Sequence, residues 1–143
     1  MRYPYGDDFD PPAPMADVKI TTNLASTADF PVKKAPVKTI RALLDTGSEI
    51  SVVPQRIVSE IEDELGDKLP YGFRYIQTVN GYSYKKTCSL QVLQGEHPCF
   101  NDESKINFIV GEGENAILGR NFLEAYSLFF DGPSGEWGPV KRC

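Results

Sequence analysis

Histidine is nearly absent from this sequence of 143 residues: His97 is the only histidine. A Ser-His-Asp or Cys-His catalytic set would have to use that residue, and its setting in His97-Pro98-Cys99 favours a surface loop. Cysteine is also scarce: Cys88, Cys99 and Cys143 leave one thiol over in any pairing and lack the close spacing of a structural zinc site. We therefore expect reduced thiols, no bound metal and no other cofactor.

Long apolar runs and an excess of positive charge are missing as well. No stretch approaches the roughly 18 apolar residues of a membrane span, and the start, Met1-Arg2-Tyr3-Pro4, lacks the apolar stretch of a signal peptide. The 15 basic and 20 acidic residues give a formal net charge of −5, which argues against nucleic acid or a membrane surface as a partner. We expect an intracellular protein of the cytoplasm.

Turn-forming residues are plentiful, with 12 glycines and 11 prolines. This composition favours one domain of short strands and many turns over a helical bundle. Four prolines and three aspartates predict that residues 1–16 form a flexible arm, and three glycines and two prolines near the other end predict a flexible tail over residues 132–143. The domain itself is expected over residues 17–131.

Alternating apolar residues and short apolar runs predict the strands of this domain. We expect strands over residues 18–24, 37–44, 50–53, 73–78, 82–93, 106–110 and 126–130, an apolar stretch that turns into a short helix over 116–124, and a polar loop over 96–105. In the second strand one face carries Ile40, Ala42 and Leu44, so that face can pack on a core. The fold class is therefore mainly β.

A helix is predicted between Pro54, which suits a first helical turn, and Gly66, which suits a helix end. Its apolar residues recur at helical spacing: Ile57, Val58, Ile61 and Leu65. Its acidic residues fall largely on the opposite side and are expected to form a solvated face: Glu60, Glu62, Asp63 and Glu64. A second, short helix is expected within residues 116–124, so the domain has one or two short helices.

The dipeptide Asn80-Gly81 separates two strand-like segments. It favours a tight type I′ turn, so we expect a long β-hairpin with Asn80-Gly81 at its tip.

One carboxylate stands at the end of a predicted buried strand. Asp45-Thr46-Gly47 directly follows Ala42-Leu43-Leu44, and an apolar strand resumes at Ile50. A carboxylate on a tight loop between two buried strands lies in low-dielectric surroundings, which disfavour its charged form. Such a group is either costly to the fold or useful in chemistry.

Three blocks in the family's order make residues 17–131 resemble the retropepsin-like aspartic proteases, the retroviral and retroelement proteases and their stand-alone cellular relatives. The segment 42–54 is similar to the active-site loop and its flanking strands, Val79-Asn80-Gly81-Tyr82 stands at the position of the flap, and Ala116-Ile117-Leu118-Gly119-Arg120-Asn121-Phe122-Leu123 is similar to the block that begins the C-terminal helix. The resemblance implies a retropepsin-like acid protease β-barrel or sandwich, a single lobe that homodimerisation completes.

The same resemblance implies roles for individual residues. Asp45 would be the catalytic carboxylate, Thr46 would hydrogen-bond across the dimer axis, and the backbone of Gly47 would meet the substrate. Ser48 would belong to the same loop, and Arg120 would brace it through an ion pair with Glu49, where the retroviral proteases have aspartate. Four residues would form the substrate-binding flap, which is less rich in glycine than the retroviral one: Val79, Asn80, Gly81 and Tyr82.

Peptide hydrolysis by this route requires two carboxylates that share a proton, one acting as general base and the other as general acid. The chain contains one Asp-Thr-Gly, so a catalytic site requires a twofold dimer with Asp45 from each subunit. The leading hypothesis is a homodimeric aspartic endopeptidase that hydrolyses extended peptide or protein substrates. The alternatives are a non-catalytic module of the same fold that binds peptides and a domain whose role is dimerisation.

The sequence leaves two groups of aromatic residues undecided. Tyr82 and Tyr84 suit either packing within the hairpin or substrate contact, and Phe129 and Phe130 suit either a strand that joins subunits or the core.

Overall fold

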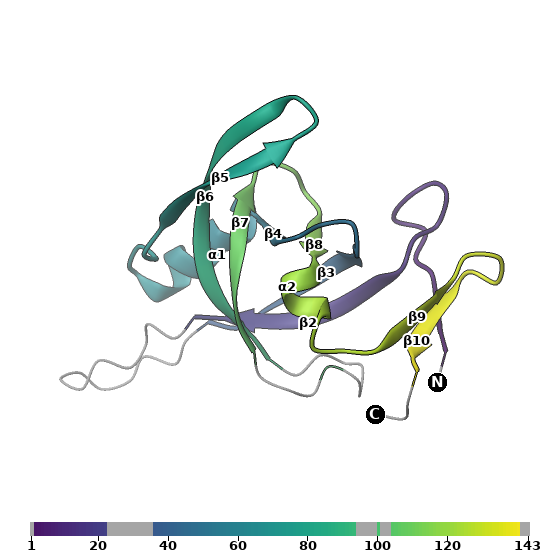
Figure 1. The fold of residues 1–143 in the computed structure, drawn as a ribbon. Helices are drawn as coiled ribbons and strands as arrows, with labels where there is room; N and C mark the ends of the chain where they lie inside the picture. The colour runs from purple at the N-terminus through teal and green to yellow at the C-terminus, as the bar shows by residue number, and fades with distance from the viewer. Residues whose placement is uncertain (1, 23–35, 94–99, 101–103, 141–143) are drawn as a thin grey trace.

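The computed structural model describes residues 2–22, 36–93, 100 and 104–140. In this part of the chain, two β-sheets and two helices confirm the predicted mainly β class (Figure 1). The polar loop expected over residues 96–105 lies largely outside the described residues, as do His97, Cys99 and Cys143.

The larger sheet closes on itself. Its strand order is β2-β3-β8-β4-β7-β6-β5, and β2 also pairs with β6, so a ring of strands forms and β5 lies outside it as the outer strand of a hairpin (Figure 1). The β3–β8 and β4–β7 pairs are parallel. The strands are β2 (Met15–Thr21), β3 (Lys38–Leu44), β4 (Ser51–Pro54), β5 (Gly72–Thr78), β6 (Gly81–Val92), β7 (Ser104–Gly111) and β8 (Ala116–Leu118).

The strands of the ring turn alternate side chains into a common core, because successive side chains of a strand point to opposite faces. In β3, Ile40, Ala42 and Leu44 are buried, as the sequence predicts. Phe108 of β7 and Leu118 of β8 are fully buried in the same cluster. This core fixes the end of β3, where Asp45 begins.

Helix α1 (Gln55–Leu65) starts directly after Pro54 and ends at Gly66, whose φ of 75° belongs to the left-handed region that glycine adopts readily. Its apolar face is buried as predicted, through Ile57, Val58 and Ile61. The prediction that the acidic residues form a solvated face is wrong for Glu62, which is buried. Its Oε2 accepts a hydrogen bond of 2.9 Å from the backbone N–H of Leu69. The carboxylate can be buried there because it accepts a hydrogen bond from a backbone donor of the segment that follows the helix.

Strands from the segments expected to be a flexible arm and tail join a strand of the expected domain in the smaller sheet. Strand β1 (Tyr3–Pro4) pairs with β10 (Glu136–Pro139), and β10 pairs with β9 (Leu128–Asp131). Trp137 of β10 is completely buried, and the ring of Tyr3 lies 4.9 Å from it. Composition did not predict this sheet, because a few aromatic contacts stabilise segments that are otherwise rich in proline, glycine and aspartate.

The hairpin of β5 and β6 is present where the sequence predicts it, but its turn differs. Thr78 pairs with Gly81, so the two turn residues are Val79 and Asn80. A type I′ turn needs positive φ at both central residues, and among the described residues only glycines have positive φ. Gly81, with φ 106°, follows the turn instead of forming its second half.

Candidate active site

Asp45 lies at the point where β3 leaves the ring. Its backbone N–H donates to the carbonyl of Leu118 at 3.0 Å, which extends the parallel β3–β8 pairing by one residue. The backbone N–H of Gly47 donates to Asp45 Oδ1 at 2.9 Å, and the N–H of Ser48 donates to the Asp45 carbonyl at 3.2 Å. The loop therefore curls around a half-buried carboxylate and fixes one of its two oxygens.

The start of helix α2 (Arg120–Leu123) holds this loop in place through backbone hydrogen bonds. The backbone N–H groups of Arg120 and Asn121 donate to the carbonyls of Ser48 and Glu49 at 2.8 and 3.3 Å. The approach requires glycine at position 119, because a Cβ built there would lie 2.7 Å from the carbonyl oxygens of Ser48 and Ile50. The Gly-Arg-Asn block thus places a backbone surface directly against the loop.

Two side chains that the sequence reasoning missed tie these elements together. Ser51 of β4 is completely buried; its Oγ donates to Asn121 Oδ1 at 2.7 Å and accepts from the N–H of Gly119 at 3.0 Å. Asn121 Nδ2 donates to the carbonyl of Asn107 in β7 at 2.8 Å. A serine inside an apolar strand was the available signal, since a buried hydroxyl needs hydrogen-bond partners.

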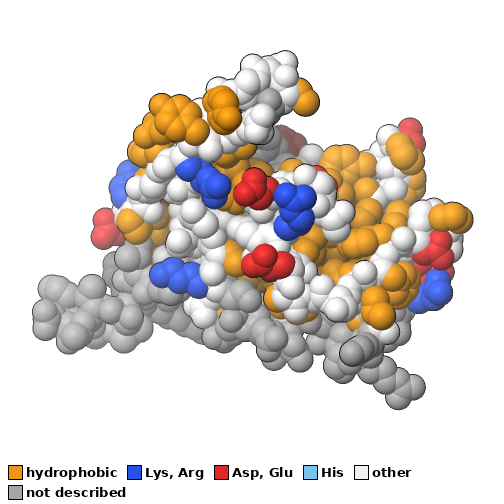
Figure 2. Space-filling model, viewed as in Figure 1, with side chains coloured by type: hydrophobic (Ala, Val, Ile, Leu, Met, Phe, Trp, Pro, Cys, Tyr) orange, Lys and Arg blue, Asp and Glu red, His pale blue; other side chains and the backbone are white. Residues whose placement is uncertain are grey.

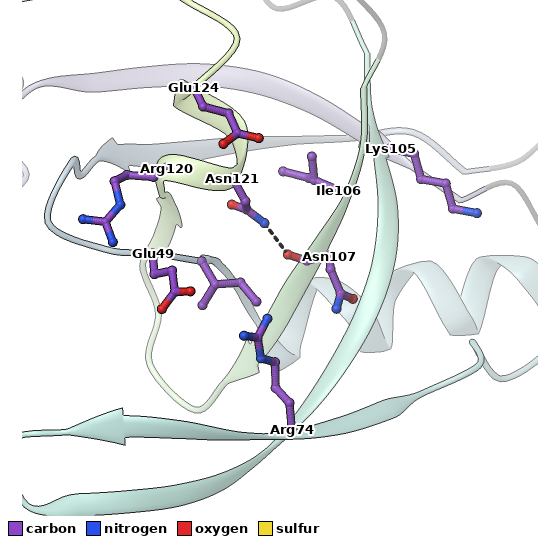
Figure 3. Close-up of a pocket in the computed structure, with 9 residues that line it drawn as sticks. Glu49, Arg74, Lys105, Ile106, Asn107, Arg120, Asn121 and Glu124 are labelled. Carbon is purple, nitrogen blue, oxygen red and sulfur yellow. Dashed lines mark hydrogen bonds between the residues drawn. The ribbon is translucent and has the colours of Figure 1, made fainter.

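The expected ion pair between Arg120 and Glu49 is wrong. Arg120 Nη1 donates to the carbonyl of Thr46 at 3.4 Å, and no Arg120–Glu49 contact lies within 4.0 Å, although both residues are described. In Figure 3 the carboxylate of Glu49 points into a cavity while the guanidinium of Arg120 lies to the side of it. Arg120 still braces the loop, through its backbone N–H and the Thr46 carbonyl.

A cavity of about 420 Å³ separates the loop from the overhanging hairpin. Its floor includes Gly47, Ser48 and Glu49, and its roof includes the β5 segment 74–77. Thr46, next to the floor, is exposed in the single chain. The space between a rigid loop and a two-stranded ribbon suits an extended peptide, which can pair with exposed backbone on either side.

The residues of the predicted flap tip are not among those that line the cavity over the loop. Val79, Asn80, Gly81 and Tyr82 are all exposed at the end of the hairpin, and the part of the hairpin over the loop is residues 74–77. The hairpin is therefore present as predicted, and the part of it that lines the cavity precedes the Val79-Asn80-Gly81-Tyr82 motif by a few residues. Spacing alone could not decide this, because it depends on where the hairpin crosses the ring.

Within the described ranges there is no cluster of three or more His, Cys, Asp or Glu side chains that could hold a metal ion. None of the helices in those ranges is long and apolar enough to cross a membrane.

Comparison with known proteins agrees with this geometry at a coarse level. The chain is similar to pepsin A from Canis lupus familiaris, with 26% identity over 111 residues that cover 68% of this chain and 29% of that protein. Pepsin A from Sus scrofa is 25% identical over 114 residues, with the same shares. No model of a known protein family matches the chain. The chain spans less than a third of the length of the pepsins it matches, and the similarity supports a general relationship to the aspartic protease superfamily.

Proposed function

We propose that this chain is a retropepsin-like aspartic endopeptidase that acts as a homodimer. The observation that carries the proposal is the placement of Asp45, on a loop between buried strands that β8 and α2 hold through backbone hydrogen bonds. The chain supplies one Asp-Thr-Gly, and the mechanism uses two carboxylates. A second copy of the chain provides the other.

In the proposed dimer the two Asp45 carboxyl groups share one proton. The ionised group removes a proton from a water molecule, whose oxygen attacks the scissile carbonyl carbon, while the protonated group donates its proton to the carbonyl oxygen. Collapse of the tetrahedral intermediate breaks the C–N bond: the first carboxyl group gives the leaving amine the proton that it took from water, and a hydroxyl of the intermediate returns its proton to the second carboxylate. The Gly47 N–H, bonded to Asp45 Oδ1, keeps the carboxylate in a fixed orientation during these transfers.

The substrate in this proposal is an extended segment of a peptide or protein. It would lie in the cavity as an added strand, between the loop backbone at Gly47 and the β5 residues above. The hairpin, with Val79, Asn80, Gly81 and Tyr82 at its tip, would act as the flap and exclude water from the reacting bond.

Strand β9 offers an edge where a second copy can pair. On one side β9 pairs with β10, and within the described residues no strand pairs with its other side. Leu128 and Phe129 are half-buried there, and Phe130 is 36% exposed. An unpaired, apolar edge strand is a template for strand addition, so two β9 strands meeting across a twofold axis would join the smaller sheets.

The test is cleavage of a mixed peptide library at about pH 5 over a range of protein concentrations, beside the Asp45→Asn variant. The shared proton predicts activity in acid and loss of activity as the pH rises. We expect cleavage to vanish in D45N and to fall more steeply than linearly on dilution, because the dimer dissociates. Absence of cleavage by folded, dimeric protein would refute the proposal and leave a peptide-binding module of the same fold.

A further inference from the structure

The cavity beneath the hairpin continues into a second one. This second cavity, of about 470 Å³, shares Glu49, Ile50, Arg74 and Arg120 with the first and extends towards Glu124 and Lys105 (Figure 3). Together the two cavities form one groove, which begins at the Asp45 loop and passes Glu49. A peptide longer than the segment beneath the hairpin would continue into it.

The charges that face each other across this groove are held apart. In Figure 3 the guanidinium of Arg74, on β5, and the carboxylate of Glu49, on the loop, point toward one another from opposite walls. Among the described residues neither side chain forms an ion pair within 4.0 Å, whereas Arg41 Nε and Asp8 Oδ2 elsewhere in the chain close to 2.8 Å. The gap between Arg74 and Glu49 is therefore open to a third group.

The β5–β6 hairpin that carries Arg74 is basic in an otherwise acidic protein. Residues 72–92 contain Arg74, Lys85 and Lys86 and no acidic residue, while the whole chain has a formal net charge of −5. The cavity beneath the hairpin is lined by two arginines and one glutamate, and so carries a positive charge of one. Blue and red side chains gather below the apolar side chains of the hairpin on the face seen in Figure 2. The net positive charge of the residues that line the cavity attracts anionic groups.

We propose that Arg74 is a substrate-binding residue that selects peptides carrying an aspartate or glutamate side chain in the segment that crosses Glu49. The inference rests on the proposed function and adds a substrate class to it. Arginine offers a planar fork of donors that matches a carboxylate, and no side chain of the described residues occupies that fork. A basic side chain in the same place would meet both Arg74 and Arg120.

The test uses a peptide that the enzyme cleaves, made as a series in which each position in turn carries Glu, Gln or Lys. We expect one position at which Glu raises kcat/KM about tenfold over Gln, and Lys lowers it, because a charge-assisted hydrogen bond contributes on the order of a factor of ten. Arg74→Gln should abolish the preference at that position, and Arg74→Glu should reverse it in favour of Lys. Arg74→Lys, which keeps the charge and loses the fork, should retain part of it.

Lys85→Gln is the matched control. Lys85 pairs directly with Arg74 across the hairpin and carries the same charge, but it lines neither cavity. K85Q should keep the preference for Glu. An equal loss in K85Q and R74Q, or no position with a preference for Glu, would overturn the inference.

A binding measurement separates this inference from the proposed catalysis. Fluorescein-labelled Glu, Gln and Lys peptides are titrated with D45N protein and with D45N/R74Q protein, and anisotropy is recorded. Tighter binding of the Glu peptide that depends on Arg74 supports the inference even if wild-type protein cleaves nothing. Equal binding of the three peptides, or no binding at all, contradicts it whether or not cleavage is found.

Discussion

Backbone hydrogen bonds from β8 and α2 hold the Asp45 loop, whereas the outer half of the β5–β6 hairpin is held by the pairing of its own two strands. The loop is bordered by completely buried groups such as Ser51, while five of the large apolar side chains that the structure exposes belong to the hairpin: Phe73, Tyr75, Val79, Tyr82 and Tyr84. Strand β6 belongs to both regions: Tyr84 in its outer half is exposed, whereas its inner half buries Thr87, Cys88, Leu90 and Val92.

The contrast matches what a hydrolase site requires of each part. A reacting carboxylate must keep its position within a fraction of an ångström, which calls for support from several elements. A cover must open to admit substrate, so few contacts to the body are an advantage. Substitutions in the two regions should therefore differ in their effect on stability, and the following predictions test that difference.

Gly119→Ala should have the largest effect. The new Cβ would lie 2.7 Å from two carbonyl oxygens of the loop, and backbone atoms cannot yield as a flexible side chain can. We expect the free energy of unfolding, measured by urea denaturation, to fall by about 3 kcal/mol. Gly113→Ala is the control, because nothing lies within 4 Å of its Cβ position, and it should change stability by less than about 0.5 kcal/mol. Equal effects of the two would contradict the close contact.

Ser51→Ala should come next, with a loss of about 2 kcal/mol in the same measurement. It removes the hydroxyl that bonds Asn121 Oδ1 and the Gly119 N–H, and leaves a buried donor without its acceptor. Ser83→Ala, at a half-buried position in the exposed outer half of the hairpin, should cost less than about 0.5 kcal/mol. A cost as large in S83A as in S51A would remove the distinction between the two regions.

Cys88, on the buried half of β6, should make the fold sensitive to alkali. Burial raises the pKa of its thiol from 9.0 to about 12. The folded state therefore holds the proton more tightly than the unfolded state, so this contribution is fully present below pH 9 and is lost as the pH rises toward 12. We expect a loss of about 1 kcal/mol at pH 10 in wild type that Cys88→Ala does not show. Parallel pH profiles of unfolding for the two proteins would refute this.

Tyr84→Ala should have the smallest effect, about 0.5 kcal/mol. The Tyr84 ring stacks on Phe73 at 5.2 Å and lies 4.9 Å from Tyr75, but it is 60% exposed, so little apolar surface returns to water. Thermal unfolding beside wild type gives the value. A loss above about 2 kcal/mol would show that the hairpin is part of the core and not a lightly held ribbon.

Features set by local pattern were predictable. The alternation in Ile40, Ala42 and Leu44 fixed the inner face of β3, and Pro54 and Gly66 marked the limits of α1 to within a residue. The apolar stretch before Asp45 predicted a carboxylate at the end of a buried strand, which is where it lies. Each of these depends on neighbours in sequence, and such neighbours report on periodicity and turns directly.

Features set by distant contacts were not predictable. Trp137 stands in a segment whose composition indicates a loose tail, and it is buried where residues distant in sequence, such as Tyr3 and Phe100, lie against it. The partner of Arg120 depends on the direction in which α2 leaves β8, which turns its guanidinium toward the Thr46 carbonyl instead of Glu49. Neither arrangement can be predicted from the sequence near these positions.

The sequence alone therefore determined a mainly β chain with Asp45 on a turn between apolar strands, because burial patterns and turn chemistry are local properties. Only the tertiary structure decided that β2 meets β6 and closes the ring, that Ser51 and Asn121 tie the loop to its supports, and that Arg74 faces Glu49 across a groove. These depend on where strands far apart in sequence cross, and that is fixed by the packing of a shared core and not by any single segment.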